Sequence, residues 1–218
     1  MPPRLQIEIE NLKKRILSLG AMVEEQVNRA IKALEKKDPD IARDVIKVDK
    51  KVDEIEVEVE EECLKILALH QPVAVDLRFI TAVIKINNDL ERIGDEAVNI
   101  AERVIYLGTR PPLNVSFDYS EMSEKTIKML KDSLDALVFL DIDLAYRVRL
   151  EDDEVDALDS GFFEKVKQII PDNSERVGSL IHIFSISHHL ERIADHATNI
   201  AEDVIYLIEG VIQRHKMQ

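Results

Sequence analysis

The sequence predicts an all-α protein made of two tandem repeated three-helix bundles, with six long antiparallel helices. The first observation is an internal repeat, because residues 90–107 return as residues 190–207 with only four of 18 positions changed. The second is apolar residues that recur every three or four positions, which is typical of amphipathic helices. The third is a low aromatic content, 5%, with no tryptophan. Together these features indicate a duplicated helical unit.

The first half of the chain predicts three helices. Apolar residues step by threes and fours across 5–34, which predicts one long helix. Asp38 can then act as the N-cap of the second helix, with a proline at the first helical position. This helix ends near Gln71, because a residue before a proline disfavours helical backbone. The third helix is expected to start at Pro72 and to stop around residue 108.

A proline-rich segment without apolar periodicity separates the two halves. We interpret it as a domain linker at residues 109–116. The predicted domains are therefore residues 1–108 and residues 117–218.

The second half repeats the three-helix pattern. Asp118 and Glu121 have the spacing of a capping box for the fourth helix. The fifth helix is expected to run to Ile170, where a proline follows. Asp172, with a glutamate three residues later, predicts a second capping box that opens the sixth helix. That helix is expected to reach about Ile212.

Composition limits the class of partner and the compartment. Acidic residues outnumber basic ones by 43 to 29, giving a net charge of −14, which disfavours nucleic-acid binding. Cys63 is the single cysteine, so no intramolecular disulfide is expected and a reducing compartment fits. The start of the chain has no signal-peptide core, and no apolar run approaches the roughly 18–20 residues that span a bilayer. We expect a soluble, cytoplasmic protein.

Carboxylates spaced one helical turn apart are the candidate site in the first half. They are Asp49 with Asp53, and Glu91 with Asp95. If the second and third helices fold back about their turn, Asp53 with Glu91 and Asp49 with Asp95 share the midpoint 72, which is the predicted turn. The four carboxylates should therefore stand at matching heights on neighbouring helices.

The second half keeps the same pattern. Asp152 and Asp156 lie one turn apart, as do Glu191 and Asp195. Asp156 with Glu191 and Asp152 with Asp195 share the midpoint 173.5, close to the predicted turn. Carboxylates about 5–6 Å apart repel by on the order of 3 kcal/mol per pair, so protonation, basic side chains or metal cations must offset the charge. Oxygen clusters suit Mg²⁺, Ca²⁺ or Mn²⁺, and carboxylate-rich bundles also hold iron. From the residues alone, metal binding and a merely solvated acidic surface both remain open.

Three histidines flank the second copy of the repeat and have no histidine counterparts in the first. They are His188, His189 and His196. A histidine near a helix face is usually a satisfied structural residue, but these imidazoles could also offer softer ligands to iron or zinc.

The duplicated Leu-Glu-Arg-Ile-(Gly/Ala)-Asp…Asn-Ile-Ala-Glu motif resembles that of the PhoU family of phosphate-transport regulators. The segment 71–78, Gln-Pro-Val-Ala-Val-Asp-Leu-Arg, resembles it too. This resemblance covers essentially the whole chain and implies two three-helix repeats that bind clustered metal ions, including iron or zinc, through their acidic motifs. Manganese and magnesium are the further candidates, and Asn99 and Asn199 are additional candidate ligands.

The resemblance also implies a role. It implies a cytoplasmic, non-enzymatic negative regulator of phosphate uptake that acts between the phosphate ABC transporter and a sensor histidine kinase. The protein is then expected to form a homodimer and to meet the membrane only through its partners.

Two alternatives compete with this interpretation. One is a carboxylate-bridged di-iron helical-bundle enzyme, which would need Glu-x-x-His motifs with inward ligands. Glu91 and Glu191 are instead followed three residues later by Gly94 and Ala194. The other is a metal-free helical adaptor or scaffold whose acidic faces are solvated. Metal content and ferroxidase activity distinguish the three.

Overall fold

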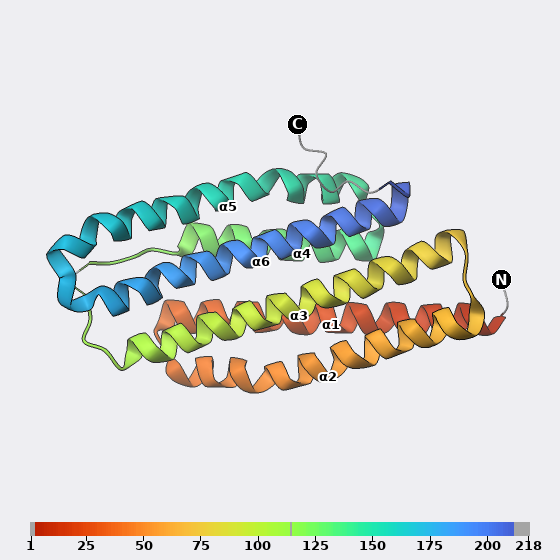
Figure 1. The fold of residues 1–218 in the computed structure, drawn as a ribbon, viewed down its shortest axis with the longest axis horizontal. Coiled ribbons are helices and arrows are strands. Elements are labelled where there is room, and N and C mark those ends of the chain that lie inside the picture. Colours follow the sequence, from red (N-terminus) through yellow and green to blue (C-terminus); the bar gives the residue numbers. More distant parts are fainter. Residues whose placement is uncertain (1–2, 114, 212–218) are drawn as a thin grey trace.

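The computed structural model describes residues 3–113 and 115–211, and within them every regular element is helical (Figure 1). The elements are α1 (Pro3–Lys36), α2 (Pro39–His70), α3 (Ala74–Gly108), α4 (Ser120–Phe139), α5 (Ile142–Ile169), the short 3₁₀ helix η1 (Ile170–Arg176) and α6 (Val177–Glu209). The predicted all-α class with tandem helical bundles is confirmed.

Each repeat packs as its own three-helix bundle. Helices α1, α2 and α3 contact one another, as do α4, α5 and α6. The two bundles meet chiefly along α3 and α6, which run antiparallel through the centre of the molecule (Figure 1). The duplicated motif therefore lies on the two helices that join the repeats.

The apolar stripe of the motif forms the core at this junction. Leu90, Ile93 and Ile100 of α3 are fully buried, and so are their counterparts 100 residues later in α6. Burying side chains of this size stabilises a fold by about 1.5–3 kcal/mol each. One face of each motif is thus used for packing, and the acidic residues lie beside it.

The start of one helix follows its predicted cap, and two other helix starts differ from the prediction. The Asp38 carboxylate accepts hydrogen bonds from the backbone of Asp40 and Ile41, so this N-cap prediction is confirmed. Asp118, in contrast, accepts from Ser120, and no side-chain bond caps α4. Helix α3 begins at Ala74 and not at the predicted proline, because the preceding residues adopt turn and extended backbone.

The turn between α5 and α6 also differs from the prediction. The expected start of the sixth helix at Asp172 is wrong, because residues 170–176 form η1 and α6 begins only at Val177. Asn173 has non-helical backbone angles, and its side chain donates to the carbonyl of Ile169. At the other end, α6 stops at Glu209 with Gly210 as a left-handed cap. The predicted end near Ile212 lies outside the described residues. The same is true of residues 1–2 of the first predicted domain and of residues 212–218 of the second.

No helix in the described part of the chain is both long and apolar enough to cross a bilayer.

Candidate metal centre

Three carboxylates of the second repeat converge on one point. Ligand oxygens of Asp156, Glu191 and Asp195 all lie within 4.8 Å of one another. Asp156 comes from α5, and the other two lie one turn apart on α6. The aspartates are exposed, whereas the side chain of Glu191 is only 19% exposed. The cluster therefore opens to solvent, with the glutamate at its buried side.

Burial and mutual repulsion disfavour ionisation in this cluster. Burial, together with the negative charges of Asp195 and Asp159, raises the pKa of Glu191 to about 7. Burial also raises the pKa of Asp152 to about 6, although the hydroxyl of Thr198 donates to it at 3.0 Å. The sequence-predicted set Asp152, Asp156, Glu191 and Asp195 is thus brought together, and its charge is poorly compensated.

One oxygen of this cluster fits a cation. Glu191 Oε2 is buried and accepts no hydrogen bond from the described residues. A buried carboxylate oxygen without a donor is costly unless a positive charge or a proton meets it. Carboxylate oxygens are also the ligands that hard divalent cations prefer. The donor set therefore fits the metal that the sequence predicts.

The first repeat assembles the matching four carboxylates. Burial, followed by the charges of Asp53 and Asp95, raises the pKa of Asp49, against the opposing hydrogen bond that Gln26 donates at 2.9 Å. Burial and the nearby Asp95 raise the pKa of Glu91, and Asp53 also contributes. The Oε2 atom of Glu91 is likewise buried without a hydrogen bond from the described residues. In both repeats, the acidic pair of one helix therefore lies near the acidic pair of the next helix, as the sequence predicts.

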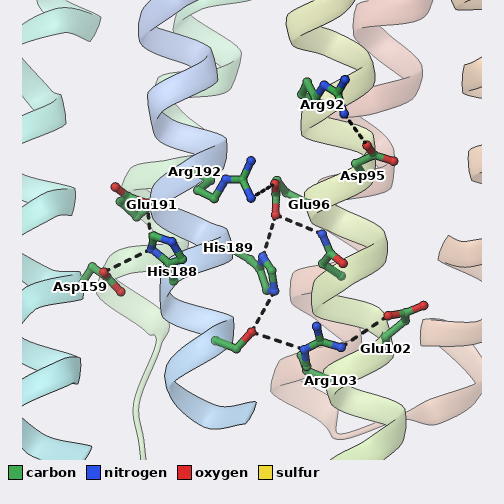
Figure 2. Close-up of polar contacts among 12 residues, drawn as sticks. Arg92, Asp95, Glu96, Glu102, Arg103, Asp159, His188, His189, Glu191 and Arg192 are labelled. Atoms are coloured by element: carbon green, nitrogen blue, oxygen red, sulfur yellow. Dashed lines mark hydrogen bonds and ion pairs between the residues drawn. The ribbon is translucent and has the colours of Figure 1, made fainter. Parts of the chain in front are cut away.

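An arginine distinguishes the two clusters (Figure 2). In the first repeat, Arg92 lies 3.3 Å from a Glu91 oxygen and 3.4 Å from an Asp95 oxygen. Its counterpart Arg192 instead forms an ion pair at 3.0 Å with Glu96 of the first repeat. The closest contact of Arg192 therefore lies at the junction between the repeats, and no arginine contacts the second cluster as closely as Arg92 contacts the first among the described residues.

Each cluster also contains an acid that the sequence prediction missed. Asp159 lies 3.6 Å from the Nδ1 atom of His188, and its charge contributes to the raised pKa of Glu191. Glu56 occupies the equivalent place in the first repeat and contributes to the raised pKa of Glu91. Both lie three residues after the second aspartate of their pair, so a helical i, i+4, i+7 pattern was the signal that could have found them.

The two asparagines are engaged at the junction of the repeats. Asn99 donates at 3.2 Å to Glu96, and Asn199 donates at 3.4 Å to Asp89. These carboxylates belong to the α3–α6 contact and not to the predicted ligand sets. As metal ligands, Asn99 and Asn199 stay a prediction.

Two of the three histidines form structural pairs across the same junction. His189 donates at 2.6 Å to Glu96, and His196 donates at 2.9 Å to Asp89. His188 faces the other way, toward the second acidic cluster (Figure 2).

These features define a class of protein: a helical protein with an internal repeat and one acidic surface cluster on each repeat. The model of the PhoU domain matches residues 16–104 and again residues 119–204. The chain therefore belongs to the PhoU family.

Similar proteins match over nearly the full chain. A phosphate-specific transport system accessory protein PhoU homolog from Aquifex aeolicus is 39% identical, with 96% of this chain and 95% of the relative covered. The accessory protein PhoU from Escherichia coli is 35% identical, with 95% and 86% covered. The crystal structure of PhoU from Pseudomonas aeruginosa superimposes with a TM-score of 0.88 at 36% identity, covering 94% of this chain and 99% of that one.

Proposed function

We propose that this protein is a cytoplasmic negative regulator of phosphate uptake and of phosphate-starvation signalling. It acts, as a homodimer, between the cytoplasmic subunits of a phosphate ABC transporter and a sensor histidine kinase, and reaches the membrane only through them. The observation that carries this proposal is the nearly full-length similarity to proteins named as accessory proteins of the phosphate-specific transport system. The helical architecture agrees with a role exercised through protein surfaces.

The proposal includes a divalent or multinuclear metal at each acidic cluster. Asp49, Asp53, Glu91 and Asp95 would hold it in the first repeat, and Asp152, Asp156, Glu191 and Asp195 in the second. The support is the buried, hydrogen-bond-free oxygen that both Glu91 and Glu191 present among the described residues. Bound metal would add positive charge beside these carboxylates.

We propose no enzymatic activity. The di-iron bundle enzymes direct their ligands into the bundle core. Here Asp156 and Asp195 are exposed, so the cluster opens to solvent. Metal at such a site would stabilise or shape a surface and not activate a substrate in a closed cavity.

The regulatory role is tested in a bacterium that lacks its own PhoU-family gene. Expression of this protein is expected to repress a phosphate-starvation reporter in phosphate-rich medium and to lower phosphate uptake. A frameshifted gene at the same expression level is the control. A reporter that stays fully active, despite soluble and abundant protein, contradicts the proposal.

The metal is tested by elemental analysis of tag-free protein reconstituted with Mn²⁺, Fe²⁺, Zn²⁺ or Mg²⁺. Asp95→Ala and Asp195→Ala are each expected to remove the metal of one repeat and to leave the other occupied. Wild-type protein that stays empty after reconstitution contradicts metal binding and leaves the metal-free adaptor.

A further inference from the structure

We propose that His188 is a metal ligand of the second acidic cluster, and that this cluster therefore selects transition metals over hard cations, unlike the first. The inference rests on the metal binding proposed above and adds an unequal preference between the two repeats.

The position of the imidazole carries the inference. His188 Nδ1 lies 3.2 Å from Glu191 Oε2 and 3.6 Å from Asp159 Oδ2 (Figure 2). Two ligands of one tetrahedral ion, bound at about 2.0–2.2 Å, are separated by roughly 3.3–3.6 Å. The nitrogen and the Asp159 oxygen lie at that separation, and the distance from the nitrogen to the Glu191 oxygen is only about 0.1 Å shorter. Glu191 Oε2 is also the buried oxygen that accepts no hydrogen bond from the described residues.

Neighbouring side chains hold both partners in place. The hydroxyl of Ser187 donates at 2.6 Å to Asp159 Oδ1, which leaves Oδ2 as the atom nearest the imidazole. The ring of Phe184 stacks on the imidazole, with an interplanar angle of 14° and centroids 6.2 Å apart. Such supporting contacts orient a ligand and are a usual feature of metal sites.

The first repeat lacks the nitrogen donor. Position 88, the counterpart of His188, is an exposed asparagine, and position 56 supplies a glutamate in place of Asp159. The first cluster also has Arg92 in contact with two of its carboxylates. It is therefore an oxygen-only site that carries its own positive charge.

Ligand type determines which metal each cluster prefers. Imidazole nitrogen suits zinc, iron, cobalt and nickel, whereas carboxylates alone suit magnesium, calcium and manganese. We therefore expect Zn²⁺ or Co²⁺ to favour the second repeat. Mn²⁺ and Mg²⁺ should distinguish less between the repeats.

The experiment uses full-length protein in which one cluster at a time is disabled. Asp53→Ala with Asp95→Ala leaves only the second cluster, and Asp156→Ala with Asp195→Ala leaves only the first. Zn²⁺ and Mn²⁺ affinities are measured by isothermal titration calorimetry, and X-ray absorption of the zinc-loaded protein reports imidazole scattering. On the second-cluster background, His188→Asn is expected to weaken Zn²⁺ about 10–100-fold and Mn²⁺ less than threefold, and to remove the imidazole signal.

Two further variants keep the result interpretable. Asn88→His, on the first-cluster background, is expected to raise Zn²⁺ affinity about tenfold, because it supplies the missing donor. His182→Asn changes a histidine of the same helix that packs on Tyr106, away from the cluster. It is expected to leave both affinities unchanged, with folding checked by circular dichroism.

The outcomes separate the two proposals. Binding of both metals that His188→Asn does not alter, or weakens equally, overturns the ligand role and the selectivity while leaving the clusters as metal sites. Absence of Zn²⁺ and Mn²⁺ binding to wild-type protein overturns the proposed metal function itself.

Discussion

Single residues decide the charge of each acidic cluster. Arg92 contacts the first cluster, whereas Arg192 reaches across to Glu96 and pairs with it at 3.0 Å. An arginine beside a carboxylate favours the charged form of that carboxylate. Because Arg192 pairs with Glu96, Glu191 lacks the close arginine that Glu91 has and ionises less readily. This agrees with the pKa of about 7 at Glu191. The same sequence motif thus gives two electrostatically different sites.

The raised pKa of Glu191 predicts a pH-dependent stability of metal-free protein. The folded state binds the Glu191 proton more tightly than the unfolded state does. The stabilisation from protonated Glu191 is therefore fully present below about pH 4.5 and is lost as the pH rises through 7. The loss should be about 2–3 kcal/mol. Urea unfolding in EDTA should therefore show Glu191→Gln gaining that much stability relative to wild type between pH 5 and pH 8.

Glu91→Gln is the matched control for this pH effect. Arg92 lies 3.3 Å from the Glu91 carboxylate, so removing that charge should change the pH dependence less. An equal difference in unfolding free energy between wild type and Glu191→Gln at both pH values would contradict the assignment.

The sequence predicted the carboxylates but not their surroundings. Helical spacing and the position of the turn suffice to place Asp49 opposite Asp95, because both depend only on distance along the chain. The ion pair of Arg192 depends on Glu96, which belongs to the other repeat. The orientation of the His188 side chain depends on the packing of α5 against α6. These are tertiary relations, which no periodicity within one helix contains.

At the scale of helices, two equivalent caps define where the middle helix of each repeat begins. Asp38 accepts hydrogen bonds from two backbone amides of α2. Asp141, 103 residues later, accepts from the amide of Leu144 in α5 at 3.0 Å. The two aspartates thus have the same role, which is to satisfy backbone amides at a helix start.

Removing either cap should cost similar stability. Asp38→Ala and Asp141→Ala are each expected to lower the free energy of unfolding by about 1 kcal/mol, because an orphan backbone donor is left at the helix start. Urea denaturation followed by circular dichroism measures the change. Asp44→Ala, which removes an exposed acid within α2, serves as the control and should stay within about 0.5 kcal/mol of wild type. Equal losses for all three variants would show that the caps contribute nothing specific.

The order of the helices could be predicted from the sequence, but the start of α6 could not. The Asp172 spacing imitates a capping box, yet residues 170–176 form η1. Arg176 at its end donates at 2.9 Å to the carbonyl of Pro111 in the segment that joins the repeats. The turn is therefore shaped by a contact 65 residues away in sequence, which a local capping signal does not report.

For the whole molecule, the junction of the repeats is an internal pseudo-two-fold interface. Glu96 pairs with His189, and Asp89 pairs with His196. Positions 96 and 196 are equivalent in the repeat, as are 89 and 189, so each position carries an acid in one copy and a histidine in the other. If the two repeats were identical, each of these pairs would join two acids or two histidines. The sequence differences between the repeats therefore make the interface complementary.

Glu96 should be the most sensitive residue of this interface. Its side chain is only 3% exposed and contacts both His189 and Arg192. Burial would raise the pKa of Glu96, but the hydrogen bond from His189 and the charges of His189 and Arg192 outweigh it and hold that pKa below its usual range. Removing one partner of a buried charge network leaves the others uncompensated, so Glu96→Ala should cost about 3 kcal/mol.

A double-mutant cycle tests whether this cost belongs to the junction. Glu96→Ala, His189→Ala and the double variant should give a coupling of about 1–3 kcal/mol in urea unfolding, because the two side chains share one network. Glu58→Ala breaks an exposed ion pair with Arg15 inside the first repeat and should cost less than about 1 kcal/mol. Additive losses at Glu96 and His189 would mean that packing alone joins the repeats. A measured coupling would mean that the exchange of acid for histidine between the copies fixes how they dock, and with it the direction in which each acidic cluster faces.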